Sequence, residues 1–260
     1  MKNSVSHFKN HRRKLFFLID IIILLILWTI VSFSSEVAYN YILPPINVVF
    51  GDFVKLIADG VLVQHITSSV LRTLLGFFLA VITAVPVGLL LGWSERFYSI
   101  FEPIIEILRP ISPIAWIPLS ILWFGIGENS KIFIIWLLAF FFIIMNAIHG
   151  VKNINPNLID AARTLGASKK FLFFKVIMPA AFPNILIGMR LGMGVSIGAV
   201  VIAEMIAAKS GIGFMMERAR TVIDPSPVII GLVLIGLLGI LTNLCFVKIE
   251  NFMMKHRVSK

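Results

Sequence analysis

The sequence is poor in cysteine and in charge. Cys245 is its one cysteine, which excludes a disulfide framework and a thiolate metal cluster. Charged residues make up 14% of the 260 residues, against about 25% in a typical soluble domain. Apolar residues make up 58% even without the 18 glycines, which is too many for a surface that faces water. The chain is therefore predicted to be an integral membrane protein.

The patterns of nucleotide and metal sites are also missing. A phosphate-binding loop requires G-x-x-x-x-G-K-[ST], and the nearest match, residues 203–210, has alanine at both glycine positions. The five histidines show no metal-ligand spacing. We therefore expect no catalytic residue, no bound metal and no cofactor in this chain. Transport is the better hypothesis for a membrane protein without a catalytic cluster.

Six stretches are long and apolar enough to cross a bilayer, which takes about 20 residues. Four prolines interrupt the third stretch, so a short interfacial helix and a kinked span are expected there. The first stretch follows a basic leader and could be a signal peptide, but its length favours an uncleaved anchor. The stretches cover about residues 15–33, 70–93, 98–124, 132–148, 184–205 and 228–247.

Positive charge gathers in three segments that six spans would place on one side of the membrane. These segments are the leader, the connection between the fourth and fifth stretches, and the tail. The positive-inside rule assigns that side, and with it both termini, to the cytoplasm. The excess of 23 Lys and Arg over 13 Asp and Glu is thereby explained, and no nucleic acid partner is expected.

Glycines recur at helical spacing in two of the predicted spans. Gly88 and Gly92 lie in the second stretch, and Gly188, Gly192, Gly194 and Gly198 lie in the fifth. Small residues at this spacing let helix backbones approach closely in lipid. Packing within one chain and an interface between two chains explain the pattern equally well. No internal repeat of the kind found in many secondary carriers occurs.

The longest polar interruption between spans, residues 153–183, carries the signals of a short helix. Asn155 is a suitable N-cap, Pro156 fits the first helical position, and Gly166 is placed to end the helix. One face of this helix is apolar and consists of Leu158, Ile159, Ala162 and Leu165. An apolar helix face on the cytoplasmic side indicates a docking surface for a partner.

A second short helix is predicted after the glycine. Ser168 can cap it, and Pro179 is expected to end it, because proline lacks the N–H that a helix interior needs.

The same segment resembles the EAA loop of ABC importer permeases. Asp160-Ala161-Ala162, three residues, Gly166, nine residues and Val-Ile-Met-Pro179 match Glu-Ala-Ala, three residues, Gly, nine residues and Ile-x-Leu-Pro. Asp replaces Glu, Val replaces Ile and Met replaces Leu. Other stretches are similar to the sulfonate, nitrate and taurine branch of that family, namely residues 43–45, 71–77, 109–113, 122–128 and 203–205.

The resemblance implies an all-α, polytopic membrane protein in the bacterial inner membrane, with both termini cytoplasmic. It implies a permease domain over residues 65–249, preceded by a transmembrane helix and external linker (1–64) and followed by a cytoplasmic tail (250–260). Two permease copies would form the pore, and separate ATPase subunits that hold ATP and Mg²⁺ would bind the loop. An external solute-binding protein would deliver a small anion. Residues Asp160, Ala161, Ala162, Gly166 and Pro179 would carry the coupling.

Three ionisable residues in or near spans are candidates for the translocation path. Charges inside a membrane are costly and mark function by default, which singles out Arg72, Arg190 and Glu204. Each could also form a structural pair or extend to the membrane surface. An ion-coupled secondary carrier that uses Glu204 and Asp20 is the alternative function. The missing repeat and the coupling loop argue against that alternative.

Overall fold

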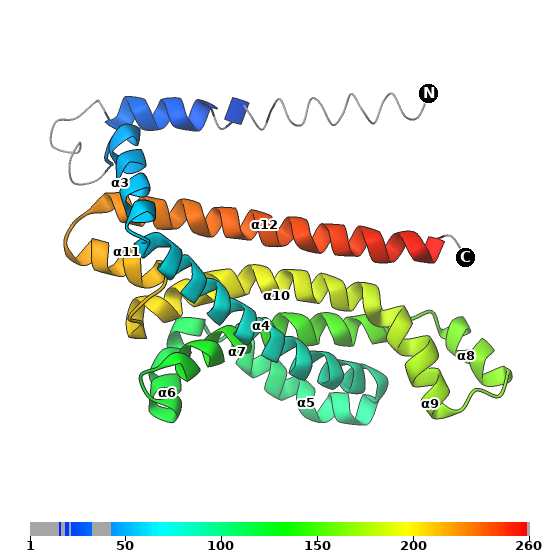
Figure 1. Ribbon diagram of the computed structural model, residues 1–260. Helices are drawn as coiled ribbons and strands as arrows, with labels where there is room; N and C mark the ends of the chain where they lie inside the picture. The colour runs from blue at the N-terminus through cyan, green and yellow to red at the C-terminus, as the bar shows by residue number, and fades with distance from the viewer. Residues whose placement is uncertain (1–15, 17–18, 21, 33–42, 259–260) are drawn as a thin grey trace, which may run out of the picture. The chain divides into compact units, whose positions relative to one another are not determined.

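The computed structural model describes residues 16, 19, 20, 22–32 and 43–258 (Figure 1). These residues are mostly helical and include no strand, which confirms the predicted all-α fold. They fall into two compact units. One contains the described residues up to 61 together with 216–231, and the other contains residues 62–215 together with those from 232 onward. The predicted boundaries near residues 64 and 249 stay predictions.

The helices follow the apolar stretches of the sequence. Besides a short apolar helix, Ile22–Ser32, they are α3 (Ile46–Ala58), α4 (Val61–Trp93), α5 (Glu95–Leu108), α6 (Pro113–Phe124), α7 (Glu128–Lys152), α8 (Pro156–Thr164), α9 (Lys169–Phe171), the π-helix η1 (Leu172–Ile177), α10 (Met178–Ala207), α11 (Ile212–Thr221) and α12 (Pro225–Val258).

Within the part of the chain that the structure describes, four helical segments are long and apolar enough to cross a membrane. They are α4, α7, α12 and the continuous run Lys169–Ile206. A fifth span results if α5 and α6, which meet at a bend of 102°, are counted together. This bend is the predicted interruption by proline. The count of six stays a prediction, since the first predicted span falls partly outside the described residues.

Glycines set the close packing of α4 on α7 and of α7 on α10. A Cβ atom at Gly88 would lie 2.6 Å from the Cβ of Ala147, and one at Gly188 would lie 2.6 Å from the Cβ of Asn146. Gly92 and Gly192 are similarly crowded, whereas a Cβ at Gly194 or Gly198 would meet nothing within 4 Å. The first four glycines therefore serve packing within the chain.

The expectation that Pro179 ends a helix is wrong. Ser168 does cap the predicted helix, since its Oγ accepts a hydrogen bond from the Phe171 N–H (3.3 Å). The helix then passes through the π-helical turn of η1 and continues as α10 beyond Pro179. Pro179 lies in the first turn of α10, and the wider π turn before it accommodates a residue that cannot donate a backbone hydrogen bond.

Candidate functional site

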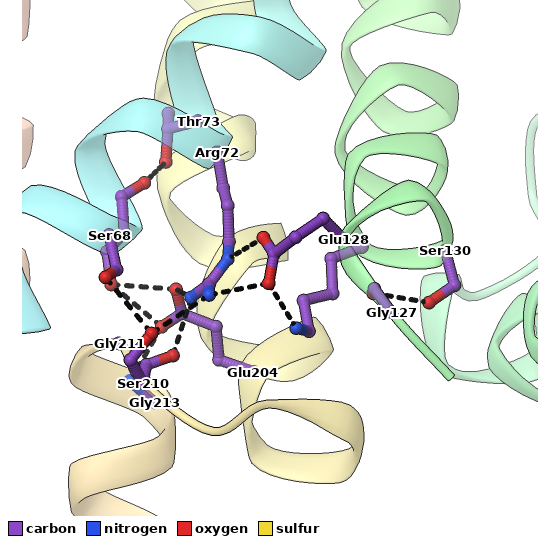
Figure 2. A network of polar contacts seen from close by, with 12 residues as sticks. Ser68, Arg72, Thr73, Gly127, Glu128, Ser130, Glu204, Ser210, Gly211 and Gly213 are labelled. Atoms are coloured by element: carbon purple, nitrogen blue, oxygen red, sulfur yellow. Dashed lines mark hydrogen bonds and ion pairs between the residues drawn. The ribbon is translucent and has the colours of Figure 1, made fainter. Parts of the chain in front are cut away.

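A buried ionic network joins four segments of the larger unit (Figure 2). Arg72 comes from α4, Glu128 and Lys131 come from the first turn of α7, and Glu204 comes from the last turn of α10. The connection from α10 to α11 closes the network with Ser210 and the residues that follow it. Segments far apart in the sequence thus meet at a single cluster of charges.

Glu204 is the most deeply buried member of the network, with no solvent exposure. Its carboxylate accepts hydrogen bonds from Arg72 Nη1 (2.7 Å), from Ser69 Oγ (2.8 and 2.9 Å) and from the Gly213 N–H (3.0 Å). A buried carboxylate is tolerated only when paired and hydrogen-bonded, and these contacts meet both conditions.

Arg72 uses all five of its N–H donors. Nη1 donates to Glu204 and to the Ser210 carbonyl oxygen (2.6 Å), and Nη2 donates to Glu128 (2.9 Å) and to Ser210 Oγ (3.1 Å). Nε donates to the second carboxylate oxygen of Glu128. A guanidinium has five such donors in a fixed planar arrangement, so the orientation of Arg72 is fully determined.

The network balances its charges. Lys131 Nζ lies 2.9 Å from Glu128, so two cations face two carboxylates. The side chains of Arg72, Lys131 and Glu204 are at most 7% exposed, whereas that of Glu128 is 56% exposed. Because Arg72 is already neutralised, a passing anion would have to displace a carboxylate to reach it.

Two glycines admit the Glu204 carboxylate to the start of α11. Gly211 has φ +124°, and a Cβ atom there would lie 2.2 Å from Glu204 Cδ. A Cβ at Gly213 would lie 2.4 Å from the carbonyl oxygen of Val201. The first turn of α11 can therefore approach Glu204 closely, and a helix N-terminus stabilises a negative charge.

Arg190, the third predicted path residue, lies elsewhere. Its Nε donates to Asn243 Oδ1 (2.7 Å), and its Nη1 lies 3.6 Å from Glu250, which links α10 to α12. Glu204 is the fourteenth residue after Arg190 on α10, which is about 21 Å along the helix axis. The structure therefore brings together Arg72 and Glu204 but not Arg190.

Sequence reasoning missed Glu128 and Lys131 as members of this site. The available signal was a pair of opposite charges, three residues apart, at the start of a predicted span. Oppositely charged residues at this spacing face each other on a helix.

The sequence also contains one Gly-x-Ser-x-Gly pattern, at residues 194–198, which is typical of serine hydrolases. Its serine, Ser196, is fully buried in the middle of α10, and its Oγ donates to the Gly192 carbonyl oxygen (2.7 Å). The hydrolase pattern requires a turn between a strand and a helix, so this match has no catalytic context. Among the described residues no group of three or more His, Cys, Asp or Glu side chains could hold a metal ion.

The predicted coupling helix α8 begins and ends as its sequence predicts. Asn155 Oδ1 accepts a hydrogen bond from the Asn157 N–H (3.0 Å). At the other end Gly166 has φ +80°, and its N–H donates to the Arg163 carbonyl oxygen (2.9 Å). The Ala167 N–H donates to the carbonyl oxygen of residue 162 (3.1 Å), which completes a Schellman motif.

The apolar face expected on α8 divides into two parts. Ile159 and Ala162 pack on a core cluster that includes side chains at the end of α7 and in η1. Leu158 and Leu165 stay exposed, at 49% and 89%. The division arises because α8, a helix of 9 residues, packs with one side against the ends of the longer helices and leaves its other side exposed. Asp160 is also exposed and lies 3.5 Å from Arg163.

Comparison with known proteins identifies the family. Residues 76–255 match the family described as binding-protein-dependent transport system inner membrane component. The taurine transport system permease protein of Escherichia coli (strain K12) is 42% identical over 186 residues, which are 72% of this chain and 68% of that protein. An aliphatic sulfonates transport permease protein of Bacillus subtilis (strain 168) is 33% identical over 237 residues, or 91% of this chain and 86% of that protein.

Two further similarities agree with this family. The nitrate import permease protein of Leptolyngbya laminosa is 35% identical over 185 residues, or 71% of this chain and 66% of that protein. The structure of the inward-facing methionine ABC transporter MetNI has the same fold, with a TM-score of 0.61 at 20% identity over 72% of this chain and 94% of the other. The chain therefore belongs to the inner membrane components of binding-protein-dependent transport systems, and it is a permease component of an ABC importer.

Proposed function

We propose that this permease imports a small anion of the sulfonate, taurine or nitrate class. The observation that carries the proposal is the similarity to permeases named for taurine, aliphatic sulfonates and nitrate, at 33–42% identity over 71–91% of the chain. Family membership implies partnership with an ATPase, which would hold ATP and Mg²⁺, and with a solute-binding protein. The bacterial cell membrane is the proposed location.

The pore would be formed by two copies of this chain. Gly194 and Gly198 support this part of the proposal, because open space lies where their Cβ atoms would stand. Leu191, one turn earlier on α10, is 47% exposed. A helix face with small residues lets a second copy pack closely in lipid, where close contact is the main source of association energy.

The α8 loop would be the docking element for the ATPase. Asp160, Ala161 and Leu165 are exposed there, and Gly166 forms the turn beside them. Ile159 and Ala162 pack on the same core cluster as the ends of α7 and α10. A displacement of α8 by the ATPase would therefore reach both long helices, and Pro179 lies where α10 begins.

The ionic network lies at the opposite end of these helices from α8. α8 follows the end of α7, whereas Glu128 lies at the start of α7, about 36 Å away along a helix of 25 residues. We assign Arg72 and Glu204 to the outer end of the path, where their pairing would hold α4, α10 and α11 together. Arg190 would act on the path through its contacts with α12.

This assignment requires α8 in the cytoplasm and the network outside. In a Cys245→Ser background, a cysteine at Lys169 should react with a membrane-impermeant thiol reagent only when the cytoplasmic face is open. A cysteine at Lys209 should react only from the outer face. Reaction of both positions from the same side would contradict the orientation.

Transport itself is tested in proteoliposomes that contain the permease, its ATPase and its binding protein. Radiolabelled taurine and nitrate are the probes, and we expect uptake of at least one that requires both ATP and the binding protein. Uptake driven by an ion gradient without ATP would instead support a secondary carrier. Uptake of neither solute under any condition would contradict the proposed substrate class.

A further inference from the structure

A cavity of about 350 Å³ lies between α7 and the bend that joins α5 to α6. Its volume falls within the range of roughly 300–1,000 Å³ that small-molecule sites occupy. Apolar and aromatic side chains form most of its wall, and the polar exceptions lie at positions 109 and 146. Its principal lining residues are Arg109, Trp116, Phe141, Phe142, Met145 and Asn146.

The cavity lies at the middle of the predicted membrane thickness. Its lining residues on α7 run from 137 to 146, which places them about 13–27 Å along a helix about 36 Å long. The bend between α5 and α6 interrupts regular helix at the same level, around Pro110. Irregular backbone at membrane depth is tolerated only where it is buried in protein or lines a water-filled cavity.

Among the residues that the structure describes, Arg109 is a cation without a carboxylate partner. Within the described residues its guanidinium makes no salt bridge and no side-chain hydrogen bond, although Glu106 lies one turn earlier on α5. Arg72 and Arg190, in contrast, both face carboxylates. Arg109 is exposed, so no other group in the described part of the chain covers its charge. Charges at membrane depth are rare and mark function by default, so this one requires a functional reason.

Two further N–H groups are available beside Arg109. The Asn146 amide uses one of its two donors on the Phe142 carbonyl oxygen (2.8 Å), which leaves the second donor. The indole N–H of Trp116 has no hydrogen-bond acceptor among the described residues. A cation and two neutral donors in an otherwise apolar wall suit a small anion and repel a cation.

We propose that this cavity holds the anionic solute during its passage, with Arg109 as the residue that contacts the sulfonate, nitrate or carboxylate group. The inference rests on the proposed function, because it names the site at which the imported anion would pause. It places the charge that recognises the anion at mid-membrane, apart from the ionic network that closes the outer end. The aromatic walls would exclude large solutes.

The charge preference of the cavity can be measured without transport. In the purified importer with Cys245→Ser, Met145→Cys places a thiol in the wall of the cavity. We expect the rate of labelling by 2-sulfonatoethyl methanethiosulfonate, relative to its trimethylammonium analogue, to fall about tenfold when Arg109→Gln is added. Arg109→Lys should retain most of the preference. Asp59→Cys, at an exposed residue that does not line the cavity, should show no dependence on residue 109.

Uptake provides a second measurement. Arg109→Gln should lower uptake of radiolabelled taurine or nitrate at least about tenfold, which corresponds to the loss of roughly 1.4 kcal/mol of anion stabilisation. Arg109→Lys should restore part of it. The matched control is Arg96→Gln, because Arg96 is an exposed arginine at the start of α5, the helix that Arg109 directly follows, and it does not line the cavity. We expect normal uptake in that control.

The two measurements separate this inference from the proposed function. An unchanged labelling ratio in Arg109→Gln, together with uptake at the wild-type level, would overturn the cavity assignment and leave anion import intact. A tenfold loss of the labelling preference in an importer that takes up neither taurine nor nitrate would support the cavity as a site for anionic groups, while the proposed substrate class would fall. If Arg109→Gln fails to assemble, a labelling preference in Arg109→Lys no greater than at Asp59→Cys would also overturn the assignment.

Discussion

Gly166→Trp should leave the permease folded in the membrane but lower its affinity for the ATPase subunit at least about tenfold, an effect of roughly 1.4 kcal/mol. Gly166 has φ +80°, a backbone conformation that is strained for residues with a side chain. No atom of the described residues lies within 4 Å of where its Cβ would stand. The bulk of tryptophan would therefore meet only a docked partner. The partner could then no longer bury Leu158 and Leu165. Each Å² of apolar surface that stays exposed forfeits about 25 cal/mol of binding free energy.

The measurement is co-purification with the ATPase, followed by substrate-stimulated ATP hydrolysis in reconstituted membranes. Two controls separate bulk from backbone strain. Gly166→Ala introduces the strain without the bulk, and Gly60→Trp introduces both at another open glycine with positive φ (+72°) outside α8. We expect both controls to bind the ATPase more tightly than Gly166→Trp. Equal binding by Gly166→Trp and the wild type would remove α8 as the docking element.

Arg72→Gln is expected to destabilise the permease by about 3–5 kcal/mol, because it leaves the buried Glu204 carboxylate without its cation. The side chains of Arg72 and Glu204 are 7% and 0% exposed, so water cannot replace the lost interaction. The same substitution also frees Glu128 and Ser210 from Arg72. We therefore expect a large drop in the thermal unfolding midpoint in detergent or nanodiscs.

Arg190→Gln is the matched control for this prediction. Arg190 is 38% exposed and its carboxylate partner lies 3.6 Å away, a pairing worth about 0–1 kcal/mol. Its unfolding midpoint should stay near that of the wild type. In addition, Arg72→Gln combined with Glu204→Gln should be less destabilised than the sum of the two single variants, because each single change leaves a buried charge. A midpoint for Arg72→Gln equal to that of Arg190→Gln would contradict the energetic role of the network.

The sequence by itself determined the features that depend on neighbouring residues. Length and apolarity located the long spans, since crossing a bilayer depends on local composition. The caps of α8 were predictable because Asn155 and Gly166 act within two to four residues of their own position. The family followed from the spacing around Asp160 and Gly166, and the comparison with permeases confirmed it.

Only the tertiary structure decided which distant residues meet. Arg72 and Glu204 are 132 residues apart, and no local pattern reports that α4 and α10 bring them together. The same packing paired Arg190 with α12 and carried the helix through Pro179. It also placed Arg109 beside a cavity, with no carboxylate partner among the described residues. Helix capping and membrane insertion depend on free energies that a short segment sets alone. Charge pairing and cavities depend on which helices pack together, and that choice is made by side-chain contacts along the whole chain.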